Sequence, residues 1–407
     1  MLRLMIIADD LTGAADTGVK FAACGPVRLI NSSFERPGGH SDLRSEPEAI
    51  NLAVATETRN LPAAKVPEAL DRALALSGGQ PPDLVYKKID SCLRGHIGLE
   101  LRHLLDHWPY QAALVAPAYP IFGRVTKEGL HYINGKPVSE TELAKDPIRP
   151  VRDSNLAKII AEGHDLPVYH LDLNLIRQGP EALLWSIDDL SRKGPALFAA
   201  DAETDADLNI VAEAGLQTKN RLILAGSAGL AEALAGRMCA GLGQVAKIKR
   251  RPGPVIFFGG SASETLRKQL LHMAEHCGAA ILTLDPARIM AGAEPDDPPG
   301  PGGDGRTLVV NLPRPEESPG YASLELIKAF GRQAAAIIKK LKPGTVFLSG
   351  GDTAREVLEA LNIDRLWVEA EIKPGVVLLG EGEMAVVTKS GTFGDISLLK
   401  EVRELLA

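Results

Sequence analysis

Charged side chains gather in three short stretches of the chain, each directly after a run of apolar residues. Asp9 and Asp10 follow the first such run, Arg59 follows another, and Lys88 to Arg94 close a third. Lysine and arginine suit a carboxylate ligand, arginine through its two-pronged guanidinium. Aspartate suits sugar hydroxyls, as a hydrogen-bond acceptor or as a base. These residue types therefore favour a ligand with a carboxylate or sugar hydroxyl groups.

The same residues also have a purely structural interpretation, as helix caps and surface salt bridges. One of two adjacent aspartates often caps the next helix, so for Asp9 the structural and functional interpretations weigh equally. For Lys88, Asp90 and Arg94 the functional interpretation is favoured, because packing alone poorly explains so much charge at the end of a strand.

Three glycine turns in the C-terminal half indicate a second kind of chemistry. Each follows an apolar run, and they lie at 259–261, 350–353 and 391. Glycine lets backbone N–H groups approach a phosphate closely, and a helix N-terminus adds about half a positive charge. Ser261 with Glu264, and Thr353 with Glu356, match the capping box that begins a helix. Together the three turns predict a nucleotide phosphate site, although each alone is a weak signal.

One apparent nucleotide motif is rejected. Residues 300–305 satisfy G-x-G-x-x-G, but they follow a Pro-rich loop and lead into a strand. The dinucleotide fingerprint requires a strand before the glycines and a helix after them, so a nicotinamide dehydrogenase is disfavoured. The Walker A pattern G-x-x-x-x-G-K-[ST] is absent from the sequence, so a nucleotide site must be built differently.

The elements that carry these motifs are predicted from hydrophobic patterning. Short runs rich in Val, Ile and Leu are typical of strands buried on both faces, and they lie at 4–8, 49–55, 83–88, 112–117, 196–200, 221–226, 254–260, 280–285, 307–312, 345–350, 376–380 and 385–389. Helical spacing occupies segments between them, including 100–108, 227–238 and 324–341. This alternation predicts an α/β fold with largely parallel sheets flanked by helices.

A length of 407 residues indicates two domains. Glycine, proline and a basic cluster interrupt the pattern near residue 245, so we expect domains at 1–240 and 254–407 joined by a linker at 241–253. The Pro- and Gly-rich segment 291–305 is expected to be a surface loop inserted between two strands of the second domain. Ligands of open α/β sheets bind beyond the carboxyl ends of the strands, where the polar motifs lie.

Composition narrows the range of partners. The formal charge is −7 and aromatic residues make up 4%, so neither a nucleic acid nor a membrane is an expected partner. The four cysteines, at 24, 92, 239 and 277, are far apart, and we expect reduced thiols rather than disulfide bonds. Two aspartates by position 10 argue against a signal peptide, so the sequence predicts a cytoplasmic protein.

Six motifs together resemble the four-carbon acid sugar kinases, two-domain bacterial enzymes that use ATP to phosphorylate threonate, erythronate or 3-oxo-tetronate. In family order they are ADDLTG (8–13), YKKIDSCLRG (86–95), APAYPIFGR (116–124), HYINGKPVSETELAKDPIRPVRDS (131–154), SGGDT (349–353) and KSGTFG (389–394). They span residues 8 to 394, so the resemblance covers essentially the whole chain. Three positions depart from the commoner family pattern without deleting a charged contact, namely Cys92, Val125 and Asp352.

The resemblance implies a division of labour between the two domains, with the active site in the cleft between them. Residues 1–240 would bind the acid sugar, through Asp10, Arg59, Lys88, Ile89, Asp90 and Ser91. Arg94, a further cation of the same stretch, is also expected to bind the acid. Residues 254–407 would bind ATP, through Ser261, Gly350, Gly351, Asp352, Thr353 and Gly391. Mg²⁺ would bridge the phosphates, with protein ligands that the sequence does not identify.

The expected reaction is phosphorylation of the terminal O4 hydroxyl of a four-carbon acid, with D-threonate the first choice. D-Erythronate and 3-oxo-tetronate are the alternative substrates, and a sugar-acid sensor without turnover is the alternative from another functional class. Asp10 is the expected proton acceptor, because Lys88 and Arg94 should lower the pKa of Asp90 and weaken it as a base. The sequence leaves a homodimer open.

Overall fold

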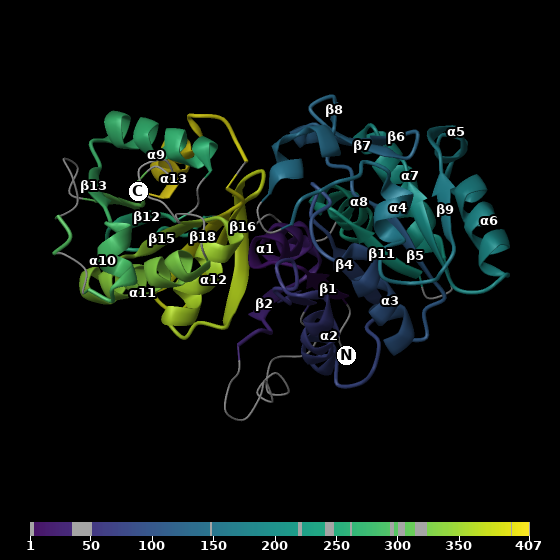
Figure 1. Ribbon diagram of the computed structural model, residues 1–407, viewed down its shortest axis with the longest axis horizontal. Coiled ribbons are helices and arrows are strands. Elements are labelled where there is room, and N and C mark those ends of the chain that lie inside the picture. Colours follow the sequence, from purple (N-terminus) through teal and green to yellow (C-terminus); the bar gives the residue numbers. More distant parts are fainter. Residues whose placement is uncertain are drawn as a thin grey trace. The chain divides into compact units, whose positions relative to one another are not determined.

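The structure is a computed structural model that describes residues 4–34, 51–146, 149–218, 222–240, 248–260, 263–293, 297–299, 306–313, 324–391 and 393–406. The chain divides into two units, residues 1–244 and residues 245–407. Figure 1 traces them along the sequence, from purple at the N-terminus to yellow at the C-terminus. None of the helices among the described residues combines the length and the apolar composition needed to cross a membrane.

Unit 1 contains a parallel sheet in the strand order β2-β3-β1-β4-β11-β5-β10-β9. Its strands are β1 (Leu4–Ala8), β2 (Val27–Asn31), β3 (Asn51–Ala55), β4 (Leu84–Lys88), β5 (Ala112–Ala116), β9 (Val168–Leu171), β10 (Ala196–Ala200) and β11 (Leu222–Gly226). A separate antiparallel sheet follows β5 and consists of β6 (Arg124–Lys127), β7 (Leu130–Ile133) and β8 (Lys136–Pro137).

Helices cover both faces of the main sheet of unit 1. On one face, Met5 and Ile7 of β1 join a core formed with α2 (Val66–Ala75), α3 (Ile97–His107) and α4 (Leu156–Ile160). On the other face, the Tyr86 ring lies near Phe21 and its hydroxyl donates to the Ser227 carbonyl. These two contacts belong to the ends of α1 (Leu11–Lys20) and α8 (Ala228–Met238). The remaining helices are α5 (Leu173–Ile176), α6 (Pro180–Ser191) and α7 (Asp205–Gln217).

Unit 2 contains a second sheet in the order β13-β14-β12-β15-β18-β17-β16. The first five strands run parallel, whereas β17 is antiparallel to both of its neighbours. The strands are β12 (Val255–Gly259), β13 (Ala280–Thr283), β14 (Thr307–Asn311), β15 (Thr345–Ser349), β16 (Arg365–Lys373), β17 (Val376–Glu381) and β18 (Met384–Lys389).

The helices of unit 2 also lie on both faces of their sheet (Figure 1). Phe257 and Phe347 stack on one another within a core that includes α9 (Glu264–Cys277) and α13 (Leu398–Leu406). On the opposite face the Phe258 ring meets the Phe330 ring edge-on, within α11 (Leu324–Leu341). The other helices of this unit are α10 (Pro286–Met290) and α12 (Gly351–Ala360).

The predicted α/β class is confirmed, and each of the twelve predicted runs contains a strand. The structure adds β2, the β6–β8 hairpins, β9 and β16 to that set. In β16 every second residue is buried, and all the positions between them except Trp367 are charged, so its apolar residues form no long continuous run. Residues 300–305 lie outside the described residues.

The expectation of reduced thiols is wrong for one pair of cysteines. Cys24 and Cys239 form a disulfide bond across 215 residues of sequence, with their Cα atoms 4.9 Å apart. Helices α1 and α8 pack together, and each of the two cysteines lies just beyond the C-terminal end of one of them. Spacing along the chain could not reveal this pair, because the helix packing alone brings the two residues together. Cys92 and Cys277 are free thiols.

Candidate functional site

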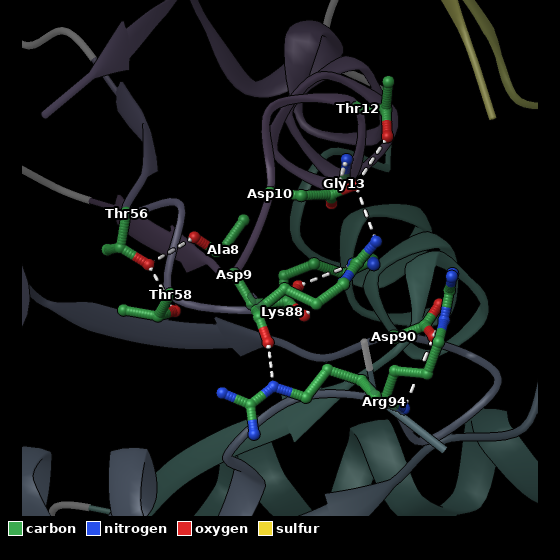
Figure 2. Close-up of polar contacts among 12 residues, drawn as sticks. Ala8, Asp9, Asp10, Thr12, Gly13, Thr56, Thr58, Lys88, Asp90 and Arg94 are labelled. Atoms are coloured by element: carbon green, nitrogen blue, oxygen red, sulfur yellow. Dashed lines mark hydrogen bonds and ion pairs between the residues drawn. The ribbon is translucent and has the colours of Figure 1, made fainter. Parts of the chain in front are cut away.

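The three charged stretches of unit 1 meet at one edge of its sheet. Ala8 of β1 is in register with Ala55 of β3 on one side and with Lys88 of β4 on the other. Since these strands are parallel, the residues that follow them emerge at the same carboxyl edge. Figure 2 shows Asp9, Asp10, Lys88 and Asp90 gathered there.

Asp9 is an ion-pair partner of Arg59. The arginine Nε and Nη2 donate to the two carboxylate oxygens of Asp9 over 2.7 and 2.9 Å, in the two-pronged geometry that arginine favours. Arg59 Nη1 donates to Asp10 over 2.8 Å. Burial alone would lower the pKa of Arg59, but Asp10 and Asp9 raise it well above its ordinary value. Arg59 is therefore a fixed cation that joins the ends of β1 and β3.

Asp10 is the N-cap of α1. Its Oδ1 accepts from the Gly13 N–H over 2.8 Å, and its Oδ2 accepts from the Thr12 hydroxyl and from Arg59. Burial alone would raise the pKa of Asp10, but Arg59, Lys88 and the Thr12 hydrogen bond together lower it. The carboxylate is thus ionised and oriented by its neighbours. A carboxylate oxygen can accept two hydrogen bonds, so Oδ1 can still accept one.

Asp90 is held by Arg94, whose Nε donates to Asp90 Oδ2 over 2.6 Å. Burial would raise the pKa of Asp90, but Arg94, Arg59 and Lys88 outweigh it and lower the pKa far below the ordinary range. Asp90 Oδ1 makes no hydrogen bond to any residue that the structure describes. This oxygen is therefore a second acceptor available to a ligand.

Lys88 differs from the other two cations of the site. Its side chain is buried, with the residue 5% exposed, yet Nζ makes no hydrogen bond or ion pair with any described residue. Its charge nevertheless contributes to the lowered pKa of both Asp10 and Asp90. A buried ammonium without a direct partner is costly unless a ligand supplies one.

The remaining predicted residues of this stretch contribute through the backbone. Ile89 has its side chain in the core, so only its main chain could meet a ligand. Ser91 is buried, and its carbonyl accepts a 2.8 Å hydrogen bond from His131 Nε2. That contact requires the Nε2–H tautomer, with Nδ1 accepting from the Thr126 hydroxyl. Burial lowers the pKa of His131 to about 4, so the ring stays neutral near pH 7.

Several residues that support the site were not predicted from the sequence. Lys87, the residue before Lys88 in β4, forms a fully buried ion pair with Glu100 over 2.6 Å. Arg149 Nε donates to the Arg59 carbonyl over 2.9 Å. His131 and Arg149 both belong to the motif at 131–154, so that motif was visible in the sequence although its contacts were not. Glu57 adopts a positive φ of 56°, a strained backbone beside Arg59.

The glycine turns of unit 2 also meet at one edge. β12, β15 and β18 are neighbours in the sheet and run parallel, with Ser349 in register with Lys389. Gly350 has a φ of +94° and donates its N–H to the Lys389 carbonyl over 2.9 Å. A Cβ placed on Gly260 would lie 2.9 Å from Thr353 Oγ1, so glycine permits close approach between the turns. Both α9 and α12 begin at this edge.

The caps of these two helices differ from the prediction. The N-cap of α9 is Ser263, whose Oγ donates to the Gly391 carbonyl over 2.9 Å. The N-cap of α12 is Gly350, because its positive φ ends the preceding turn and lets the helix begin at Gly351. Both capping-box predictions are therefore wrong, and Thr353 lies inside α12 with its side chain buried. Ser261 lies outside the described residues.

Gly226-Ser227 lies at the end of β11 and forms a structural turn. The Ser227 hydroxyl accepts from the Gly229 N–H and caps α8. A Cβ on Gly226 would lie 2.4 Å from the Ala116 carbonyl, so glycine is required by close packing.

Two family models match the chain in succession. Residues 4–234 match a sugar-binding N-terminal domain, and residues 314–399 match a nucleotide-binding C-terminal domain. Among curated proteins, a D-threonate kinase of Salmonella typhimurium is 30% identical over 98% of this chain and 97% of its own. A 3-oxo-tetronate kinase of Methylobacterium radiotolerans is 29% identical over the full length of both.

Two solved structures share the fold. A Salmonella typhimurium LT2 protein superposes with a TM-score of 0.79, and the Haemophilus influenzae protein HI1011 with a TM-score of 0.73. The two alignments cover 100% and 99% of this chain and the whole of each related chain, at 21% identity. At that identity the likeness concerns the fold alone.

Proposed function

The chain belongs to the four-carbon acid sugar kinases, and we propose that it transfers the γ-phosphoryl group of ATP to the O4 hydroxyl of a four-carbon sugar acid. The observation that carries this proposal is Lys88, a buried ammonium with no direct partner among the described residues, close to two carboxylates that keep acceptor capacity. One cation for a carboxylate, beside acceptors for hydroxyls, suits a small sugar acid.

The substrate carboxylate is assigned first to Lys88. Arg59 was expected to bind the acid as well, but three of its five N–H donors engage Asp9 and Asp10. Two donors are left for a ligand, so Arg59 acts mainly as the group that fixes the aspartates. Arg94 is similarly committed to Asp90 and helps to hold that carboxylate in place.

Asp10 is the proposed acceptor of the hydroxyl proton. Its cap bond and its bond from Thr12 fix the carboxylate, while Oδ1 can still accept from a substrate hydroxyl. The lowered pKa of Asp10 does not disqualify it, because a group that takes the proton late in a loose phosphoryl transfer need not be strongly basic. Asp90, whose pKa is lowered against the effect of burial, mainly by Arg94 and Arg59, would orient other hydroxyls through Oδ1.

ATP is assigned to unit 2, where Gly350, Gly351, Asp352, Thr353 and Gly391 line the edge at which α9 and α12 begin. Backbone N–H groups at helix N-termini favour phosphate. The described residues hold no cluster of three or more His, Cys, Asp or Glu side chains suited to a metal. Mg²⁺ commonly binds through substrate phosphates with few protein ligands, and such a site fits these residues. When bound, it would neutralise phosphate charge.

For transfer, the acid and the nucleotide must meet, so the proposal includes an active site in the cleft between the units. It also includes a cytoplasmic location, where ATP is the available donor. Disulfide bonds are rare in cytosolic proteins, and the structure contains the Cys24–Cys239 bond. Titration of the thiols in the purified protein would show whether this bond forms, and the result bears on the proposed location. The proposal also includes a homodimer, and light scattering would measure the oligomeric state.

The test is release of ADP in the presence of Mg²⁺ and each of D- and L-threonate, D- and L-erythronate and 3-oxo-tetronate. D-Threonate should give the highest kcat/KM. Preference for D-erythronate or 3-oxo-tetronate would correct the substrate within the same reaction class. Tight binding of an acid by calorimetry, without ADP release from any of them, would instead support a sensor and contradict the proposal.

A further inference from the structure

Another buried lysine lies at the nucleotide edge of unit 2. Lys389 is the last residue of β18 and is 1% exposed. Its Nζ donates to three carbonyl oxygens of the turn that follows, over 2.7 Å to Ser390, 3.0 Å to Phe393 and 3.4 Å to Gly391. Among the described residues no carboxylate pairs with it. Burial alone lowers the pKa of Lys389 to about 7.

Lys87 of unit 1 provides a built-in comparison. It also lies at the carboxyl end of a central strand, is fully buried, and donates to the carbonyl of the next residue over 2.9 Å. Lys87, however, is neutralised by Glu100 in a 2.6 Å ion pair. A buried ion without a counter-ion is expensive to the folded state. Lys389 therefore carries a cost that Lys87 avoids, and packing does not explain why.

Carbonyl oxygens of the turn after Lys389 accept hydrogen bonds from side chains of the protein. Besides the three bonds from Lys389, Ser263 Oγ donates to the Gly391 carbonyl. Gln269 Nε2 of α9 donates to the carbonyls of Phe393, Gly394 and Asp395. Oxygens that would repel a phosphate are thus engaged by donors of α9 and β18, and a positive charge lies beneath the turn.

We propose that Lys389 is a positioning residue for the nucleotide: its ammonium fixes the carbonyls of Ser390, Gly391 and Phe393 and supplies the positive charge that attracts the phosphates. A site without a Walker A lysine lacks the usual cation in its phosphate loop. Lys389 would supply that charge from the end of β18, behind the backbone of the turn. The triphosphate would in turn be the missing counter-ion of the buried lysine. This inference rests on the assignment of ATP to unit 2.

The test uses two variants of the full chain, Lys389→Met and Lys389→Gln. Methionine keeps much of the apolar stem and removes both charge and donors, whereas glutamine removes the charge but keeps N–H donors on a shorter side chain. Both should raise the KM for ATP at least tenfold and weaken ATP binding in calorimetry to match. The KM for the acid should stay within about twofold, because Lys389 belongs to the other unit. Far-ultraviolet circular dichroism and the unfolding midpoint would verify folding.

Ser263→Ala is the matched control, because it removes a donor to the Gly391 carbonyl without removing a charge. It should raise the KM for ATP less than either lysine variant. An unchanged KM for ATP in both lysine variants would overturn the inference, as would full recovery in Lys389→Gln or an equal rise in both KM values. Failure of the wild-type chain to bind ATP would instead contradict the proposed function itself.

Discussion

The proposed acid site at the sheet edge of unit 1 and the proposed nucleotide site at the sheet edge of unit 2 use different chemical groups. The edge of unit 1 is built from side chains, with Asp9, Asp10 and Asp90 balanced by Arg59, Arg94 and Lys88. The edge of unit 2 is built from backbone turns and helix N-termini around one buried lysine. Small acids differ in the arrangement of their carboxylates and hydroxyls, so specific side chains are needed to distinguish them. A phosphate chain is the same in every ATP molecule, and repeated N–H groups are enough to hold it.

The two edges also differ in how their charge is balanced. In unit 1, Arg59 pairs directly with Asp9 and Asp10, and Arg94 pairs directly with Asp90. Lys88 has no direct partner among the described residues, and the substrate would supply one. In unit 2 the positive charge of Lys389 has no carboxylate partner among the described residues. Each edge therefore holds one buried ammonium whose direct counter-ion is missing, and both ligands of the proposed reaction are anions.

The strongest test of the unit 1 network is Asp10→Asn. The amide keeps the shape of the carboxylate but cannot take a proton, so turnover should fall by about 10²–10⁴ with substrate binding largely kept. Steady-state kinetics with ADP detection would measure it. Near-normal turnover in Asp10→Asn, together with abolished turnover in Asp90→Asn, would exchange the roles of the two aspartates.

Arg59→Ala should lower the free energy of unfolding more than it weakens binding of the sugar acid. It leaves Asp9 and Asp10 without their main cation, and breaking a buried pair by removing one partner typically costs about 3–5 kcal/mol. Urea unfolding measures the loss. Arg102→Ala is the matched control, since its partners Asp106 and Asp165 are exposed and such pairs contribute about 0–1 kcal/mol. Equal losses in both variants would contradict the buried network.

Lys88→Met should behave in the opposite way and spare the fold. The substrate carboxylate would lose a charge-assisted bond of about 1.5–3 kcal/mol, which corresponds to a rise of about 10- to 100-fold in the KM for the acid. The KM for ATP should change little. Lys65→Met, at an exposed lysine of the same unit, should leave both constants unchanged. An unaltered KM for the acid in Lys88→Met would contradict the assignment of the substrate carboxylate to Lys88.

The buried lysine of unit 2 predicts a pH dependence. Between pH 7 and pH 9 the unfolded chain keeps the lysine proton while the folded chain releases it, because the folded pKa of Lys389 is about 7. The unfolded state then binds more protons, so the free energy of unfolding of wild type should rise relative to Lys389→Met by about 1.4 kcal/mol per pH unit. Below pH 7 the difference should level off. Urea unfolding from pH 6 to pH 9 would measure it, and a constant difference would mean that Lys389 titrates elsewhere.

The same titration should affect nucleotide binding in the other direction. As the ammonium loses its proton above pH 7, wild-type affinity for ATP should fall, whereas Lys389→Met should show no such step. Calorimetry across the same pH range would separate this effect from changes in stability.

Much of this arrangement could be predicted because the strands are short, buried and end in polar motifs. The run at 4–8 and the helix at 324–341 match β1 and α11 residue for residue. The convergence of Asp10, Arg59 and Lys88 follows from parallel strands that end at one edge. These are consequences of local patterning combined with one rule of sheet topology.

The pairing of the charges could not be predicted in the same way. Which aspartate caps α1 depends on φ and ψ at a single residue, and the structure assigns the cap to Asp10 and the main Arg59 pair to Asp9. The Lys87–Glu100 pair and the contact of His131 with the Ser91 carbonyl join residues 13 and 40 positions apart. Such contacts depend on how helices and hairpins pack on the sheet, which periodicity does not report.

The central claim is that the acid binds to unit 1 and the nucleotide to unit 2, and amide hydrogen exchange on the full chain tests it without relying on turnover. Addition of D-threonate should slow exchange in peptides that cover 8–13, 56–61 and 87–95. Addition of a non-hydrolysable ATP analogue with Mg²⁺ should slow exchange in peptides that cover 345–353 and 389–394. Protection of the first set by the nucleotide and of the second set by the acid would contradict the account.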